Sequence, residues 1–277
     1  MKLYNIFSMS TFCTLIFSTP VFSTQKPDLY ILIHGSFASP KHMMAYGNRL
    51  HWCQPGHKSF ELLKKITSAR IINHPWSGGI HLSSLIAGAK ELIVLIKQHA
   101  PTHTIHIVAH SNGGNVALLA LDELARNATT VIVDELIVLG TPIHFNWYPK
   151  SINAVRRIYN LFSYGDIIQP VFGNYERLLP EHNHVFNIQV KMNNKPATHN
   201  ELYRSPIIQL IPQFRHLFAK NNKYCLDCLI NNGHTIQIDE TREADMLADR
   251  KYTHGSHYRV KASSFINDIK SAIEDIN

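Results

Sequence analysis

The stretch IVAHSNGGNVAL, residues 107–118, decides the fold. Its apolar run ends at Ser111, and Gly113 and Gly114 then open a segment with apolar residues at helical spacing. This pattern predicts a buried strand, a sharp turn at Ser111 and a helix. A glycine two positions after the serine removes the Cβ that would collide in such a turn. The position two before the serine is Ala109, whose methyl group still allows the turn to close.

Strand and helix patterns alternate along the chain from Leu29 onward. Strands are expected in LYILIHG (29–35), ARIINHPWSGG (69–79), HTIHIVAH (103–110), TVIVDELIVLGTP (130–142), RIYNLFSYGD (157–166) and HVFNIQV (184–190). Helices are expected in SFELLKKI (59–66), LSSLIAGAKELIVLIKQHA (82–100), GGNVALLALDELARN (113–127) and SPIIQLIPQFRHLF (205–218), the last interrupted at Pro212. The alternation predicts an α/β fold, a mostly parallel central sheet with helices on both faces.

The carboxyl ends of parallel strands meet at one edge of a sheet, where reactive groups gather. The residues just past the predicted strands are His34, Gly35, Ser36, Trp76, Ser111, Thr141, Asp166 and His199. A serine hydroxyl needs a base, a group that orients the base, and donors aimed at the developing oxyanion. The amide of Asn112, at the start of a helix, is one expected donor. The amide of Ser36 is expected to be the second, with Phe37 as the alternative.

The motifs LIHG, AHSNGG and LGTP, in this order and at these spacings, resemble the α/β-hydrolase superfamily, and most of all its small lipases and esterases. The resemblance runs from about Leu29 to about Ile211. It implies ester hydrolysis without a metal or organic cofactor, an acid after a later strand and a histidine after the next strand. Chain order then makes Asp166 the acid and His199 the histidine of a triad with Ser111.

Other residues compete for these roles. Asp134 lies at the wrong end of its predicted strand, and Asp122 lies inside a predicted helix. His254 and His257 are the alternatives to His199. His182 and His184 precede the last predicted strand and should therefore lie at its amino end, far from the site. His110 is expected to pack or hydrogen-bond locally rather than act as the base.

The residues around the expected site carry milder predictions. His34 is expected to order the loop that holds the oxyanion donors, and Thr141 and Pro142 to shape the rim of the substrate pocket. The residues expected to line the substrate site are His34, Gly35, Trp76 and Thr141. Trp76 either lines the pocket or is a structural loop aromatic. The aromatic segment 143–154 either covers an acyl chain or simply connects two strands.

The ends of the chain predict processing and an extra unit. Residues 1–23 have the pattern of a secretory signal peptide cleaved before Thr24, which indicates a secreted or periplasmic protein; an uncleaved membrane anchor is the alternative. Residues 24–220 are expected to form the hydrolase core. Residues 221–277 exceed what the core needs and are expected to pack on it as a small appendage, or to bind a partner.

Cysteine and histidine spacing does not favour a metal site. Cys225 and Cys228 could form a short disulfide, but no second such pair completes a zinc site. His103 and His106 would point to opposite faces of a strand. No metal and no cofactor are therefore expected.

The formal net charge of +7 comes from scattered Lys and Arg residues without a nucleic-acid-binding motif, so nucleic acid is not expected as a partner. Contact with an anionic membrane surface is the alternative to an ordinary basic surface. The sequence thus predicts a secreted serine hydrolase acting on small-molecule or lipid esters. Acyl transfer, thioester or amide cleavage on the same triad, and a non-catalytic hydrolase-like binding protein, remain the alternatives.

Overall fold

The computed structural model describes residues 25–37, 51–126, 133–144, 153–173, 177–180, 182 and 184–214, and the backbone of 234–238. The predicted signal peptide, His254, His257, the Cys225–Cys228 pair and most of the segment 143–154 lie outside these residues. Across the described part of the chain, no helix is both long and apolar enough to span a membrane.

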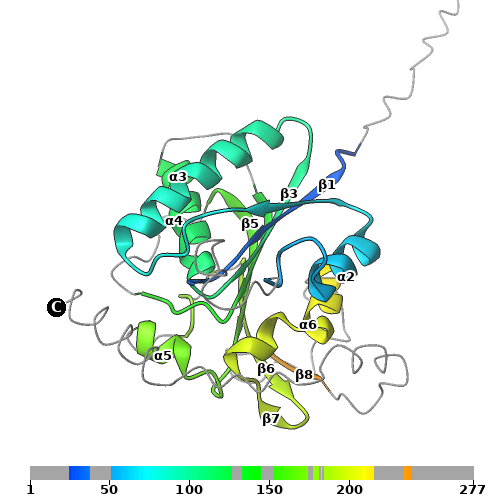
Figure 1. Ribbon diagram of the computed structural model, residues 1–277, viewed down its shortest axis with the longest axis vertical. Helices are drawn as coiled ribbons and strands as arrows, with labels where there is room; N and C mark the ends of the chain where they lie inside the picture. Colours follow the sequence, from blue (N-terminus) through cyan, green and yellow to red (C-terminus); the bar gives the residue numbers. More distant parts are fainter. Residues whose placement is uncertain are drawn as a thin grey trace, which may run out of the picture.

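The centre of the protein is a sheet with the strand order β2-β1-β3-β4-β5-β6-β7, in which β8 also pairs with β6 (Figure 1). The strands are β1 (Asp28–Ile33), β2 (Arg70–His74), β3 (Thr104–His110), β4 (Val133–Leu139), β5 (Val155–Phe162), β6 (Val185–Met192), β7 (Lys195–Pro196) and β8 (His234–Ile238). Every neighbouring pair is parallel except β6 and β7, which form a short antiparallel hairpin. The predicted α/β class and mostly parallel sheet are confirmed.

Helices cover both faces of the sheet. They are α2 (Lys58–Thr67), α3 (Leu82–His99), α4 (Asn112–Arg126), α5 (Ile168–Phe172) and α6 (Ser205–Leu210), with the 3-10 turns η2 (His199–Tyr203) and η3 (Ile211–Gln213). Figure 1 shows α3 and α4 on one side of the sheet and α2 and α6 on the other. Since side chains alternate along a strand, each face of the sheet has its own apolar core.

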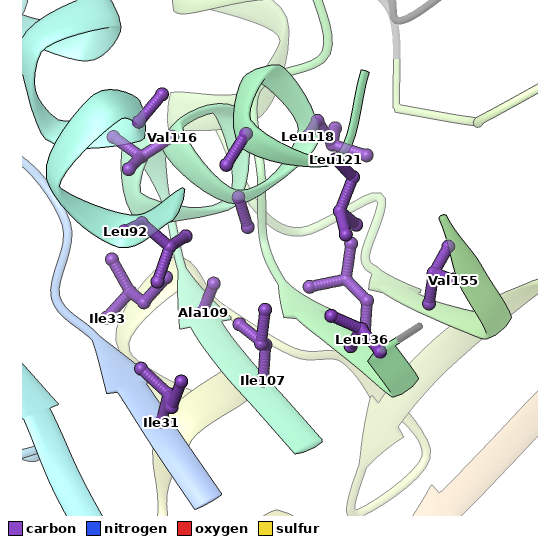
Figure 2. Packing of buried hydrophobic residues seen from close by; sticks show 14 of the residues in the cluster. Ile31, Ile33, Leu92, Ile107, Ala109, Val116, Leu118, Leu121, Leu136 and Val155 are labelled. Atoms are coloured by element: carbon purple, nitrogen blue, oxygen red, sulfur yellow. The ribbon is translucent and has the colours of Figure 1, made fainter. Parts of the chain in front are cut away.

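The core under α3 and α4 is built from one set of strand side chains. Figure 2 shows Ile31 and Ile33 of β1, Ile107 and Ala109 of β3, and Leu136 of β4 packing toward Val116, Leu118 and Leu121 of α4. The other set, including Tyr30, Leu32 and Val108, packs against α2 and α6. These buried strands fix the position of the loops at their carboxyl ends, where the candidate site lies.

Two details concern the end of the described chain. The predicted interruption at Pro212 is confirmed, because α6 ends at Leu210 and the chain continues as the 3-10 turn η3. Residues 234–238, inside the segment expected to be an appendage, form β8, which runs parallel to β6 in the same sheet. This part of the segment therefore extends the sheet itself.

Candidate active site

Ser111 occupies a sharp turn between β3 and α4. Its φ of 54° lies in the left-handed region, which is uncommon for a residue with a side chain. Its amide donates to the carbonyl of Leu139 at 2.9 Å, which ties the turn to the end of β4. Gly113 makes the turn sterically possible, because a Cβ there would overlap with the carbonyl oxygen of His34. The turn predicted from the sequence is present.

The loop after β1 lies directly against this serine. A Cβ built on Gly35 would lie 2.7 Å from Cβ of Ser111 and 3.3 Å from its Oγ. His34 donates from Nδ1 to the carbonyl of Gly35 at 2.7 Å, so this imidazole does order the loop. The indole of Trp76 donates to the carbonyl of His34 at 2.8 Å and stacks on its ring with 5.5 Å between centroids. Trp76 is buried in the core, which favours its structural role over a pocket wall.

The two candidates for the second oxyanion donor differ in their contacts. The amide of Phe37 donates to the carbonyl of Gly78 at 2.9 Å and is therefore already used. Oγ of Ser36 accepts a hydrogen bond from Nδ2 of Asn112 at 2.9 Å, which holds the Ser36 loop against the start of α4. This arrangement favours the amide of Ser36 over that of Phe37.

Asp166 and His199 meet at the carboxyl ends of β5 and β6. Oδ2 of Asp166 lies 2.7 Å from Nδ1 of His199. The other oxygen, Oδ1, accepts from the amides of Ile168 and Gln169 at 2.8 and 3.2 Å. Asp166 is fully buried, whereas the side chain of His199 is 15% exposed. A buried carboxylate with both oxygens bonded holds the imidazole in one orientation while leaving its edge accessible.

Gly140 connects this pair to Ser111. A Cβ on Gly140 would lie 3.0 Å from Oδ2 of Asp166 and 3.2 Å from Nδ1 of His199, and its φ of +62° suits glycine. The carbonyl of the preceding residue, Leu139, accepts a hydrogen bond from the amide of Ser111. The serine turn and the acid–histidine pair thus flank the same end of β4. Their order, with the serine after β3, the acid after β5 and the histidine after β6, matches the order that the resemblance implied.

The chain has the α/β-hydrolase fold.

Comparison with solved structures found several similar chains. The chain is similar to a protein assigned to the cell surface hydrolases of Lactobacillus plantarum (14% identity, 70% of this chain and 92% of that chain, TM-score 0.45). It is also similar to one assigned to the α/β-superfamily hydrolases of Xanthomonas campestris (11%, 67% and 99%, TM-score 0.41). An esterase from Rhizomucor miehei matches at 11% identity and TM-score 0.36, over 55% of this chain and only 59% of that esterase. Comparisons with protein families and with curated proteins found no match.

His110, next to the serine in this α/β-hydrolase fold, contacts the candidate base. Nε2 of His110 donates to the carbonyl of His199 at 3.3 Å, and the two rings lie 4.6 Å apart. Burial, then the nearby His199 and His51, lower the pKa of His110 well below the ordinary value of 6.5. His110 is therefore a neutral donor that holds the loop of His199. This is the local hydrogen-bonding role that the sequence predicts for it.

The rival acids are engaged elsewhere. Asp134 pairs with Arg156 at 3.0 Å on β4 and β5, and Asp122 pairs with Arg126 at 2.7 Å within α4. His182 and His184 precede β6 and lie at its amino end, as predicted.

A second ionisable group lies at the amino ends of the strands. His106, Asp134 and Glu135 bring ligand atoms within 4.8 Å of one another, the one such group found among the described residues. Both ring nitrogens of His106 are already bonded, to Glu135 at 2.8 Å and to Asp28 at 3.2 Å. Asp134 is paired with Arg156. Ion pairing accounts for this group, and its residues do not require a metal.

Three side chains in the site were not predicted. Asn115 donates to Asn112 and to the carbonyl of Pro142, and Gln169 bridges the ends of β4 and β5 through the carbonyl of Thr141 and the amide of Ser163. Arg177 donates to the carbonyl of Asp166 at 3.2 Å. Thr141 itself is fully buried against Gly114, so that it packs under the site rather than facing an open rim.

Proposed function

We propose that the protein is a serine hydrolase that cleaves carboxylic esters, with Ser111 as nucleophile, His199 as base and Asp166 as the acid that orients the base. One observation carries the proposal. The 2.7 Å contact between Asp166 and His199 adjoins the strand end that anchors the left-handed turn of Ser111. A serine hydroxyl becomes nucleophilic when an oriented imidazole can reach it, and this strand end brings the serine turn and the imidazole to the same edge of the sheet.

The reaction follows from these positions. Oγ of Ser111 attacks the ester carbonyl carbon, its proton moves to Nε2 of His199, and the carbonyl electron pair moves onto oxygen. The amides of Ser36 and Asn112 donate to this oxyanion, and each such donor contributes on the order of 3 kcal/mol to lowering the barrier. Collapse expels the alcohol, which takes the proton from His199. Water then attacks the acyl-enzyme by the same steps and releases the acid.

Exposed apolar side chains near the acid support lipid esters as the substrate class and a membrane or lipid surface as a contact. Tyr164 and Ile167 flank Asp166 and are 61% and 73% exposed, and Val171 and Leu178 are also exposed. Apolar side chains at the edge of a site lower the free energy of contact with acyl chains. Binding to vesicles of anionic and of zwitterionic lipid would separate a charge-driven contact from an apolar one.

Export of the chain is proposed from the sequence of its first 23 residues. The mature protein is expected to begin at Thr24, and N-terminal sequencing of the protein recovered outside the cytoplasm checks this. Recovery of a membrane-bound chain that keeps residues 1–23 would favour the anchor instead.

The decisive experiment combines labelling with turnover. A fluorophosphonate probe is expected to modify Ser111 of the purified protein, as mapped by mass spectrometry, and Ser111→Ala and His199→Ala are expected to abolish labelling. A panel of p-nitrophenyl esters from short to long acyl chains, with Ser111→Ala as the blank, measures hydrolysis. Added alcohols, thioesters and amides in the same assay reveal transfer or other acyl substrates. A folded protein that neither labels nor hydrolyses any of these would refute the proposal and leave the binding-protein alternative.

A further inference from the structure

A charged side chain holds the backbone of the proposed acid from outside its own turn. Nη2 of Arg177 donates to the carbonyl of Asp166 at 3.2 Å, and Cζ of Arg177 lies 5.6 Å from the ring centroid of Tyr164. Nε of Arg177 is buried, with no hydrogen-bond partner among the described residues, so the guanidinium is partly removed from water. A charged donor of this kind holds a carbonyl more firmly than a neutral donor does.

The segment 177–180 is itself held by a pair of buried asparagines. Asn160 of β5 and Asn187 of β6 face each other in register, and Nδ2 of Asn160 donates to Oδ1 of Asn187 at 2.8 Å. Asn187 also bonds both backbone groups of Leu179, donating to its carbonyl at 2.8 Å and accepting from its amide at 3.0 Å. Asn160 donates to the carbonyl of Arg177 at 2.9 Å. The two side chains therefore bind the backbone of this segment much as a neighbouring strand would.

The orientation of both asparagines is fixed by the backbone groups that they contact. The amide of Leu179 can only donate and its carbonyl can only accept, so Asn187 must present Oδ1 to the first and Nδ2 to the second. Asn160 must then turn its NH₂ toward Asn187 and toward the carbonyl of Arg177. This leaves Oδ1 of Asn160 buried without a hydrogen-bond partner in the part of the chain that the structure describes. An apolar pair would avoid this unbonded oxygen but would release the segment, so the asparagines contribute the position of residues 177–180.

We propose that Arg177 is a positioning residue for the acid, and that Asn160 and Asn187 fix the place from which it acts. The inference rests on the proposed function, and in this role Arg177 does not touch the substrate. The amides that bond Oδ1 of Asp166 belong to the same turn and move with it, whereas Arg177 ties the turn to β5 and β6. It thereby sets the direction in which Oδ2 meets Nδ1 of His199 at 2.7 Å. A displacement of about 1 Å at a catalytic group lowers a rate by about 10²-fold.

Substitution of Arg177 in the purified protein tests this role. A hydrogen bond to a charged group corresponds to about 10-fold to 100-fold in rate, so Arg177→Met is expected to lower kcat for p-nitrophenyl ester hydrolysis by about that factor. KM should be nearly unchanged, because Arg177 acts on the acid and not on the substrate. Arg177→Lys keeps a charged donor and is expected to recover most of the lost kcat. The rate of fluorophosphonate labelling at Ser111 should fall in parallel with kcat.

A double-mutant cycle asks whether Arg177 acts through the acid. Asp166→Asn alone is expected to lower kcat by about 10⁴-fold. If Arg177 only positions this side chain, Arg177→Met adds little to that loss, whereas an independent effect would multiply it by about a further 10-fold to 100-fold. Asn160→Leu removes the donor that holds the Arg177 carbonyl. It should lower kcat by about threefold to tenfold, with no further loss when it is combined with Arg177→Met.

Two controls separate positioning from damage to the fold. Arg156→Met is the matched substitution, since Arg156 also lies against β5 but pairs with Asp134 at 3.0 Å and has a side chain that is 60% exposed. It should stay within about threefold of wild-type kcat. Thermal unfolding of each variant identifies any loss of fold. If Arg177→Met does not fold, Arg177→Gln, whose side chain is too short to reach the same carbonyl, takes its place.

The outcomes distinguish this inference from the function on which it rests. A wild-type protein that neither labels at Ser111 nor hydrolyses esters would overturn both. If the wild type is active, the positioning role alone is overturned by an Arg177→Met variant that is as fast as wild type or changes only KM, or by Arg177→Lys being as slow as Arg177→Met. A multiplicative loss with Asp166→Asn would overturn the action through the acid. An unchanged kcat in Asn160→Leu would overturn the role of the asparagine pair.

Discussion

The replacement Asp166→Asn is the sharpest test of the proposed chemistry, because it exchanges one carboxylate oxygen for an NH₂ group and keeps the shape of the side chain. The carboxylate offers two different oxygens. Oδ1 accepts two backbone amides, from Ile168 and Gln169, while Oδ2 faces Nδ1 of His199 at 2.7 Å. An asparagine must place its NH₂ at one of these positions and its oxygen at the other.

The two backbone donors decide the orientation. An NH₂ group facing them would leave two buried N–H groups without acceptors, at about 1–3 kcal/mol each. The preference for keeping oxygen on that side is therefore at least about 2 kcal/mol, or about 30-fold. The NH₂ of the asparagine then faces Nδ1 of His199, which must become an acceptor. The imidazole is forced to carry its hydrogen on Nε2 and cannot take the proton of Ser111.

The expected result is a loss of about 10⁴-fold in kcat for ester hydrolysis near neutral pH, which corresponds to about 5.5 kcal/mol of barrier. The assay is p-nitrophenyl ester hydrolysis with Ser111→Ala as the blank, supported by the rate of fluorophosphonate labelling. Asp134→Asn is the matched control, because Asp134 pairs with Arg156 away from the site. A folded Asp166→Asn protein within tenfold of wild-type kcat, or an equal loss in Asp134→Asn, would refute the reasoning.

Four further predictions concern stability and reactivity. Gly114→Ala should lower the free energy of unfolding, measured in urea, by about 1–3 kcal/mol, because the new Cβ would overlap with Oγ1 of Thr141. An unchanged free energy of unfolding would contradict this packing. Burial, with His34 and His57 nearby, lowers the pKa of His51 from 6.5 to about 3, so the unfolded chain alone binds this proton between those values. Stability should therefore fall by up to about 1.4 kcal/mol per unit as the pH drops from 6.5, and His51→Gln should flatten that slope. Burial lowers the pKa of His106, but its partners Glu135 and Asp28 raise it overall. The stabilisation that protonated His106 gives the fold should therefore be complete below pH 6.5 and be lost as the pH rises through the folded-state pKa. His106→Gln should remove this pH dependence of the free energy of unfolding. Burial raises the pKa of the Cys53 thiol to about 12, so peptide mapping should find it unmodified by a thiol reagent until the protein unfolds.

Much of the fold was accessible from the sequence because its strands are buried on both faces. Such strands are continuous apolar runs, and the helices between them carry apolar residues at helical spacing. Parallel topology then places every strand's carboxyl end at one edge. The contact between Asp166 and His199 could be anticipated because the α/β-hydrolase resemblance implies an acid after one late strand and a histidine after the next, although His254 and His257 were alternatives for the histidine.

Other features depend on contacts between loops that leave no local pattern. The amide of Phe37 donates to the carbonyl of Gly78, a backbone contact that no side-chain pattern in the sequence indicates. Arg177 reaches the carbonyl of Asp166 from a separate segment, and its position depends on the packing of that segment. From the sequence, Trp76 fits a pocket wall and a structural loop aromatic equally well; its burial and its stacking on His34 favour the structural role. Side-chain direction in loops is set by tertiary contacts, and periodicity carries no information about it.

Two histidines on β3 show how one strand can hold the same side chain in opposite charge states. His106, near the amino end, lies between Glu135 and Asp28, whose negative charges favour its protonated form. His110, four residues later on the same face, is surrounded by other imidazoles and apolar groups that favour its neutral form. This difference matters for the proposed reaction, because His199 becomes positively charged when it takes the proton of Ser111. A second positive charge on His110, at the 4.6 Å ring separation, would oppose that step by about 3–4 kcal/mol at an effective dielectric constant of about 20. Burying His110 as a neutral donor keeps the positive charge at the carboxyl end of the sheet for His199, where the oriented carboxylate of Asp166 can stabilise it.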